Sequence, residues 1–227
     1  MAKLFIVATP IGNLGDITLR AIEVLKSVDF ILAEDTRVTK KLLSRFAFSK
    51  TLISFQEHSS PKVLERILNL LKEGKDLALV TDAGTPGISD PGRRLIGAYL
   101  KAKLPSESVA TVVPVPGPSA LAAIISVSDI DLSEFAFLGF PPQKKGRQTF
   151  FKRLSKFDIP VILFESPHRI QKTLKELEAV CGDAYVNAGR ELTKIYEEVF
   201  RGKLSEAQKH FVGEKQRGEF VIVLCKS

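Results

Sequence analysis

The sequence has little of what builds disulfide-rich, metal-binding or membrane proteins. Its 227 residues include two cysteines, three histidines and no tryptophan. Two cysteines exclude a disulfide scaffold and a cysteine-rich zinc module, and three scattered histidines predict no metal site. No window approaches the roughly 18 uninterrupted apolar residues of a membrane span. The apolar N-terminal run stops at Pro10, which is typical of a first strand and not of a signal peptide. We therefore expect a cytoplasmic protein.

The common nucleotide-binding and hydrolase signatures are missing as well. The sequence contains no G-x-x-x-x-G-K-[ST], and no G-x-G-x-x-G follows an apolar run. It also lacks the G-x-S-x-G of a nucleophile elbow. These absences argue against a P-loop enzyme, a dinucleotide-binding or common Rossmann-like methyltransferase fold, and a serine hydrolase.

The charge that is present leans basic. The chain has 33 Lys and Arg against 26 Asp and Glu, a net charge of +7. The excess is spread over both halves, with 16 basic and 12 acidic residues in 1–115 and 17 and 14 in 116–227. A polyanionic partner fits this surplus, and so does an ordinary basic cytosolic protein.

Apolar runs alternate with amphipathic segments along the first half. The pattern predicts strands at 3–9, 30–33, 77–81 and 110–115 and helices at 17–27, with Asp16 as its N-cap, and at 38–46, 61–72 and 90–102. Strands that alternate with helices favour a mostly parallel sheet. Prolines at 114, 116 and 118 mark a domain join.

The second half alternates in the same way. We expect strands at 135–140, 161–164, 185–188 and 220–224 and helices at 119–126, 147–156 and 170–180. The predicted architecture is therefore α/β, with one domain over residues 1–116 and another over 117–227.

Four loops that follow predicted strands stand out, because ligands of open α/β sheets bind at the carboxyl ends of the strands. They are 9–16 (TPIGNLGD), 33–37 (AEDTR), 82–92 (DAGTPGISDPG) and 116–120 (PGPSA). Glycines let a backbone approach a ligand closely, and prolines fix a loop's shape. The carboxylates of AEDTR are able to orient or deprotonate a hydroxyl, or they simply cap a helix.

The second half offers charged segments at strand ends and a basic patch. FESPHR (164–169) and RELTK (190–194) each follow an apolar run. His168 is either a base or a helix-start residue. The segment 143–156 carries six positive charges and no negative one, which suits phosphate contacts. The basic helix at 38–46 offers a second contact.

Taken in order, these motifs resemble one family closely. ATPIGNLGDIT, AEDTR, TDAGTPGISDPG, VPGPSA, FLGFPP, FESPHR, RELTK and GEFVIVL are similar to the bacterial small-subunit ribosomal RNA cytidine-2′-O-methyltransferases of the tetrapyrrole-methylase class, and the match runs from Lys3 to Leu224. The resemblance implies two α/β domains of the tetrapyrrole-methylase type, with S-adenosylmethionine in the cleft between them, and a homodimer. It implies methyl transfer to the ribose 2′-hydroxyl of a cytidine in the decoding region of 16S rRNA in the small ribosomal subunit. Many members continue beyond the last strand; if that extension helps to hold RNA, this chain relies more on its basic patches.

The resemblance also assigns residues. The cofactor contacts it implies are Pro10, Asp82, Ala83, Gly84, Thr85, Pro86, Ile88, Ser119, Ala120, Phe164, Glu165, Glu191 and Leu192. The candidates for a general base are Glu34, Asp35 and His58, with Asp35 favoured by its loop position. The RNA contacts are expected at Arg37, Lys40, Lys41, Lys144, Lys145 and Arg147. No metal is required.

Two other interpretations stay open. A tetrapyrrole C-methylase of cobalamin or sirohaem synthesis would share the fold and act on a polycarboxylate macrocycle, although AEDTR and FESPHR match the RNA-modifying branch. A non-enzymatic RNA-binding or ribosome-assembly factor would have lost its cofactor affinity.

Overall fold

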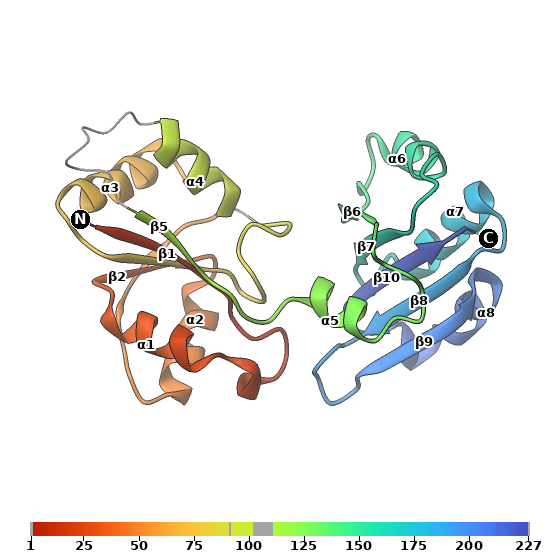
Figure 1. The fold of residues 1–227 in the computed structure, drawn as a ribbon, viewed down its shortest axis with the longest axis horizontal. Coiled ribbons are helices and arrows are strands. Elements are labelled where there is room, and N and C mark those ends of the chain that lie inside the picture. Colours follow the sequence, from red (N-terminus) through yellow and green to blue (C-terminus); the bar gives the residue numbers. More distant parts are fainter. Residues whose placement is uncertain (1, 91, 102–110, 227) are drawn as a thin grey trace. The chain divides into compact units, whose positions relative to one another are not determined.

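The computed structural model describes residues 2–90, 92–101 and 111–226. By its internal contacts the chain divides into two compact units, Met1–Ser119 and Ala120–Ser227 (Figure 1). Each unit consists of a five-stranded sheet with helices packed on it, so the predicted α/β class is confirmed. Within the described ranges, no helix combines the length and the apolar composition that a membrane span requires.

The first unit is built on a fully parallel sheet. Its strands are β1 (Lys3–Val7), β2 (Phe30–Ala33), β3 (Thr51–Ser54), β4 (Leu77–Val80) and β5 (Thr111–Val115), in the order β3-β2-β4-β1-β5. The helices are α1 (Leu19–Ser27), α2 (Thr36–Arg45), α3 (Pro61–Lys72) and α4 (Gly92–Lys101). Strand β3 is absent from the sequence prediction. The predicted ends at Ala102 and Ala110 lie outside the described residues.

Both faces of this sheet are covered, as expected for parallel strands that are apolar on both sides. One core joins Leu4, Leu77 and Leu79 to residues of α3 and α4. The other joins Val7, Ala78 and residues of α1 and α2. Successive side chains of a strand thus enter opposite layers. Because the strands are parallel, the four loops that follow β1, β2, β4 and β5 lie at the carboxyl edge of the sheet (Figure 1).

The start of α1 corrects one prediction. Asp16 does not cap this helix, because it ends a short 3-10 turn, Leu14–Asp16, that precedes the helix. Thr18 takes the cap position, and its hydroxyl accepts a hydrogen bond from the amide of Ala21 at 3.0 Å. Asp35 caps α2, which therefore begins at Thr36, two residues before the predicted start.

The second unit has a mixed sheet. Its strands are β6 (Ala136–Gly139), β7 (Val161–Glu165), β8 (Tyr185–Arg190), β9 (Glu198–Lys203) and β10 (Phe220–Cys225), in the order β6-β7-β10-β8-β9. Only β6 and β7 pair in parallel among the described pairs. The helices are α5 (Ala120–Ser126), α6 (Arg147–Leu154), α7 (Ile170–Cys181) and α8 (Leu204–His210), and a 3-10 turn spans Gly213–Gln216. Strand β9 and helix α8 are absent from the sequence prediction.

A single large core holds this unit together. It joins α6, α7 and α8 to the strands through buried residues that include Phe151, Leu174 and Phe211. Helix α5 contacts β10, and its Ile124 lies so close to Gly189 that a Cβ there would be 2.9 Å from the Ile124 side chain. The strand ends that carry FESPHR and RELTK are therefore fixed by a packed core.

Candidate active site

Three of the predicted cofactor loops meet at the carboxyl edge of the first sheet. Thr9, after β1, exchanges two backbone hydrogen bonds with Gly84, after β4, at 3.0 and 3.1 Å. The hydroxyl of Thr85 donates to the carbonyl of Pro118, after β5, at 3.0 Å. The fold of this unit thus brings to one edge the following predicted cofactor residues: Pro10, Asp82, Ala83, Gly84, Thr85, Pro86, Ile88 and Ser119.

The loop after β4 is shaped by its glycines and one aspartate. Gly84 has a φ of +85°, and a Cβ there would lie 3.3 Å from the Ile11 side chain. The carboxylate of Asp90 accepts from the amides of Gly87 and Gly92 at 2.7 and 2.8 Å. Because an added Cβ at Gly92 would lie 2.8 Å from the Gly87 nitrogen, only glycine fits this fold of the loop.

A cavity of about 330 Å³ opens beside these loops. It brings together Pro10 and Asp82, predicted for the cofactor, and Lys41, predicted for RNA. The other lining residues are Thr9, Leu14, Val38, Thr39, Leu42 and Thr81. These residues were not predicted as site residues from the sequence. The signal for two of them was the spacing of Val38 and Leu42, which are four apart and therefore lie on one side of α2.

At this edge the carboxylate of Asp35, the favoured candidate for the base, already has structural partners. Its carboxylate caps α2 through the amide of Arg37 at 2.8 Å and pairs with the Arg37 guanidinium at 2.6 Å. These hydrogen bonds lower the pKa of Asp35 to about 2. A carboxylate that holds its charge so firmly is a weak proton acceptor.

Glu34 is in the opposite situation. Burial raises the pKa of its carboxyl, and repulsion from Asp82 and, more weakly, Asp90 adds to the rise. Its own carbonyl accepts from the Gln56 side chain at 3.1 Å, and the Asp35 amide donates to Asp82 at 2.9 Å. The loops after β2, β3 and β4 are thereby tied together around Glu34. His58 is exposed in the loop after β3.

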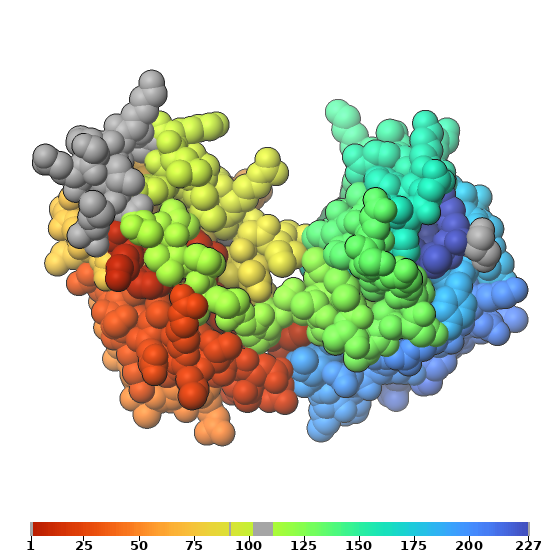
Figure 2. All heavy atoms as spheres, in the orientation of Figure 1, coloured from red at the N-terminus to blue at the C-terminus, as the bar shows by residue number. Residues whose placement is uncertain are grey.

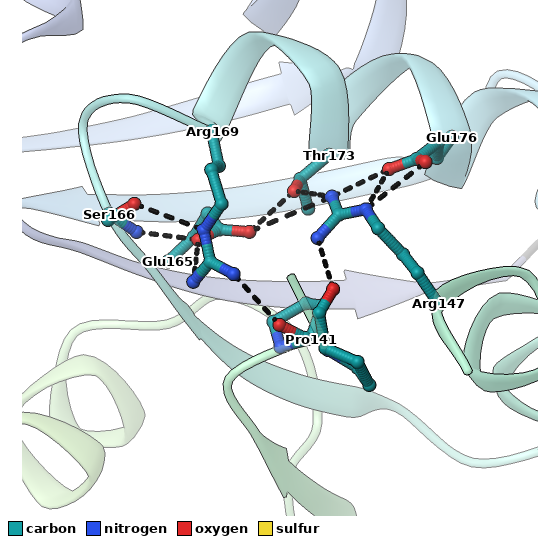
Figure 3. Close-up of polar contacts among 8 residues, drawn as sticks. Pro141, Arg147, Glu165, Ser166, Arg169, Thr173 and Glu176 are labelled. Carbon is teal, nitrogen blue, oxygen red and sulfur yellow. Dashed lines mark hydrogen bonds and ion pairs between the residues drawn. The ribbon is translucent and has the colours of Figure 1, made fainter. Parts of the chain in front are cut away.

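In the second unit, the predicted cofactor residue Glu165 is buried in an ionic network (Figure 3). Its side chain is 0% exposed. It accepts from Arg169 at 2.8 Å, from the Ser166 amide at 2.7 Å and from the Thr173 hydroxyl at 2.6 Å. These partners engage both carboxylate oxygens. Phe164 is half-buried, with its ring 5.5 Å from that of Phe140.

Arg147 belongs to the same network, and its prediction as an RNA contact is wrong. Its side chain is only 5% exposed and its guanidinium pairs with Glu176 at 2.6 Å. The same guanidinium donates to Thr173 at 2.6 Å and to the Pro142 carbonyl at 3.0 Å. A guanidinium that is only 5% exposed and has these partners is not placed to contact a phosphate.

The RELTK turn is held in an unusual backbone conformation. Glu191 and Thr193 have φ of +51° and +68°, and such values are uncommon outside glycine and cluster at functional sites. The Glu191 carboxylate accepts from Lys194 at 2.8 Å and from the Glu219 amide at 2.9 Å. Burial acts to raise its pKa, but these bonds outweigh burial and the pKa is lowered. Leu192 is buried beside it.

The remaining predicted RNA contacts are exposed. Arg37, Lys40 and Lys41 lie on α2, and Lys144 and Lys145 precede α6. In Figure 2 the atoms around α6 project from the body of the second unit. Over the described ranges, no three His, Cys, Asp or Glu side chains are grouped as a metal site would require.

Comparison with known proteins shows the family to which the chain belongs. The family model of tetrapyrrole (corrin/porphyrin) methylases matches residues 3–208. A protein of Thermotoga maritima named ribosomal RNA small subunit methyltransferase I is 47% identical over 99% of this chain and 98% of its own length. A protein of the same name from Borrelia garinii is 45% identical, and 99% of each chain is covered. The chain therefore belongs to the tetrapyrrole methylase family and, within it, to the ribosomal RNA small subunit methyltransferase I family.

Solved structures agree on the fold. The methyltransferase CobJ superposes with a TM-score of 0.71 over 100% of this chain and 95% of its own, at 14% identity. A uroporphyrin-III C-methyl transferase of Thermus thermophilus, complexed with S-adenyl homocysteine, gives 0.65 over 99% and 98%, at 15% identity.

Proposed function

We propose that this chain transfers the methyl group of S-adenosylmethionine to the ribose 2′-hydroxyl of a cytidine in the decoding region of 16S ribosomal RNA. The observation that carries the proposal is the 47% identity, over nearly the full length of both chains, to a protein named ribosomal RNA small subunit methyltransferase I. The cytidine, the 2′-oxygen and the decoding region come from the motif resemblance described above.

The carboxyl edge of the first sheet fits the cofactor. S-adenosylmethionine supplies a methyl group on a positively charged sulfur. The carboxylates of Asp82 and Asp90 repel that of Glu34 at this edge, so a cation placed there relieves the repulsion. Asp82 and Ala83 are exposed in a loop whose course is fixed by Gly84 and Asp90. The structure of similar fold that is complexed with S-adenyl homocysteine supports S-adenosylmethionine as the cofactor, without indicating the edge at which it binds here.

We assign the general base to Glu34. A ribose hydroxyl is a weak nucleophile, and a base is most effective when its pKa approaches the working pH. Burial and the neighbouring aspartates move the Glu34 pKa in that direction. The residue stands directly after β2, at the edge where Pro10 and Asp82 line the cavity. In this account Glu34 accepts the proton of the 2′-hydroxyl as its oxygen attacks the methyl group.

The exposed lysines of α2 and of the loop before α6 are the proposed RNA surface. Lys40, Lys41, Lys144 and Lys145 are exposed, and phosphate contacts made by such cations weaken with salt. The resemblance assigns further cofactor contacts to residues that are numbered from 120 onward, and these stay part of the proposal: Ala120, Phe164, Glu165, Glu191 and Leu192. It also implies a homodimer in the cytoplasm, which is proposed as well. Light scattering of the purified chain decides the oligomeric state.

A labelled-methyl transfer assay tests the reaction class. The chain is incubated with methyl-labelled S-adenosylmethionine and either small ribosomal subunits that lack the modification or a reduced tetrapyrrole polycarboxylate. We expect label in RNA and none in the macrocycle. Label only in the macrocycle would establish the C-methylase alternative, and failure to bind the cofactor at all would favour the non-enzymatic interpretation.

A further inference from the structure

The network around Glu165 adds ionic contacts to a unit whose helices already pack on an apolar core. Helix α6 is already anchored in the apolar core through Phe150, Phe151 and Leu154. Beyond this, two arginines meet at one buried carboxylate, with Arg169 at 2.8 Å and Arg147 at 3.9 Å from Glu165. A buried ionic cluster is a poor source of stability by itself, which directs attention to what the arginines hold.

Both guanidinium groups reach the same short segment of main chain (Figure 3). Arg169 donates to the carbonyl of Pro141 at 3.0 Å, and Arg147 donates to the carbonyl of Pro142 at 3.0 Å. Two consecutive prolines have restricted backbones, and the carbonyl of each accepts a hydrogen bond from one of the two guanidinium groups. The position of this dipeptide is therefore set by Glu165 at the end of β7.

The segment that these contacts fix carries exposed lysines. It begins at Phe140, whose ring lies 5.5 Å from that of Phe164, and it ends at Gly146, whose φ of +84° leads into α6. Lys144 and Lys145 lie between these anchors and are exposed. Both ends of the basic loop are thus held by the β7 strand end and its network, while its centre faces solvent.

Thr173 links the two halves of the network. Its hydroxyl donates to Glu165 at 2.6 Å and accepts from Arg147 at 2.6 Å. It is completely buried in α7. Removing this hydroxyl while keeping the shape of the side chain would break the hydrogen-bonded link between Arg147 and Glu165 and leave only their 3.9 Å ion pair, without deleting a charge.

We propose that Glu165, Thr173, Arg147 and Arg169 are positioning residues for the RNA substrate. They hold the Pro141–Pro142 carbonyls and so keep Lys144 and Lys145 where they meet the phosphate backbone. This proposal rests on the proposed function and deepens it. It gives the Glu165 side chain a role in RNA engagement.

A double-mutant cycle with Thr173→Val and the double substitution Lys144→Ala/Lys145→Ala tests the proposal. Thr173→Val should weaken RNA binding by roughly five- to tenfold, as the loss of a charge-assisted hydrogen bond allows, and leave the cofactor Kd within about twofold. Thr173→Ser, which keeps the hydroxyl, should restore RNA binding. Because Thr173→Val acts through the lysines, its effect and theirs should not multiply.

The controls separate this proposal from the proposed function. Arg201→Lys alters an exposed arginine of the same unit, which bonds the Val127 carbonyl, and should leave RNA affinity unchanged. The proposal is overturned if Thr173→Val binds RNA like the wild type, if the cofactor Kd shifts by the same factor, or if the effects multiply fully.

Hydrogen exchange tests, without RNA, whether the network holds the loop that carries Lys144 and Lys145. The Arg147 amide donates to the Lys144 carbonyl at 3.2 Å, and its exchange should quicken in Thr173→Val but not in Thr173→Ser. Unchanged exchange would show that the network does not hold the loop. If the wild-type chain binds no RNA, the proposed function fails, and the exchange comparison still decides whether the loop is positioned.

Discussion

The substitution Glu34→Gln, compared with Asp35→Asn, separates the two carboxylates of the AEDTR segment. A positioned base contributes about 10²–10⁴-fold to a rate. Because the leaving group of a sulfonium methyl transfer is good, we expect a loss near the lower limit, about 10²-fold, for Glu34→Gln. Asp35→Asn should lower the methyl-transfer rate by less than about fivefold, because asparagine caps a helix as well as aspartate does. The ion pair that is lost involves Arg37, which is 86% exposed, and exposed ion pairs contribute about 1 kcal/mol at most.

The assay is single-turnover methyl transfer at saturating cofactor, measured across pH. In the wild type the rate should fall as pH drops through the Glu34 pKa, which is raised above 4.5, and Glu34→Gln should abolish this limb. Glu34→Gln should slow the reaction but stabilise the fold. A carboxyl whose folded pKa is raised loses stability as pH rises through that pKa, so removing the charge should increase the melting temperature at neutral pH. A near-normal rate for Glu34→Gln with cofactor bound would refute the base assignment.

Three further perturbations probe the fold and the RNA surface. Gly84→Ala should destabilise the chain by about 1–3 kcal/mol, because φ is +85° there. Gly97→Ala in α4 should stabilise it by about 0.5–1 kcal/mol, because an added Cβ meets nothing within 4 Å. Urea denaturation measures both free energies of unfolding, and equal effects would contradict the reasoning. Arg147→Met should cost about 3 kcal/mol, because Glu176 loses its arginine and the buried Glu165 keeps only Arg169 as an ionic partner among the described residues. A surface-like loss below about 1 kcal/mol in the same assay would show that the network is not intact in solution. Removing Lys144 and Lys145 together should reduce the slope of log Kd for RNA against log salt by about one unit per lysine; an unchanged slope would exclude them from the RNA surface.

The parallel sheet and its functional edge could be predicted because their signals are local. Each buried strand is a short apolar run, and each ends at residues such as Pro10 or Asp82 that break the run. Parallel strands place such ends at one edge. Strand β3 escaped prediction because TLIS is short, and β9 because EVFRGK is half-exposed and charged.

The roles of individual charged residues could not be predicted, because their partners are distant in sequence. Arg147 looks like its lysine neighbours, but Thr173 and Glu176, which bury it, come 26 and 29 residues later. Asp35 and Glu34 are adjacent and chemically alike. Only the fold shows that Arg37 stabilises the charge of one while burial and Asp82 oppose the charge of the other.

The most direct test of the central claim identifies the methylated atom. Unmodified small ribosomal subunits are incubated with the chain and methyl-labelled S-adenosylmethionine, and the RNA is then hydrolysed completely in alkali. A 2′-O-methyl group blocks cleavage of the adjacent phosphodiester bond, so we predict label in one alkali-resistant dinucleotide whose 5′ nucleoside is cytidine. Label released only in mononucleotides would place the methyl group on a base, and unlabelled RNA in the presence of bound cofactor would contradict the account outright.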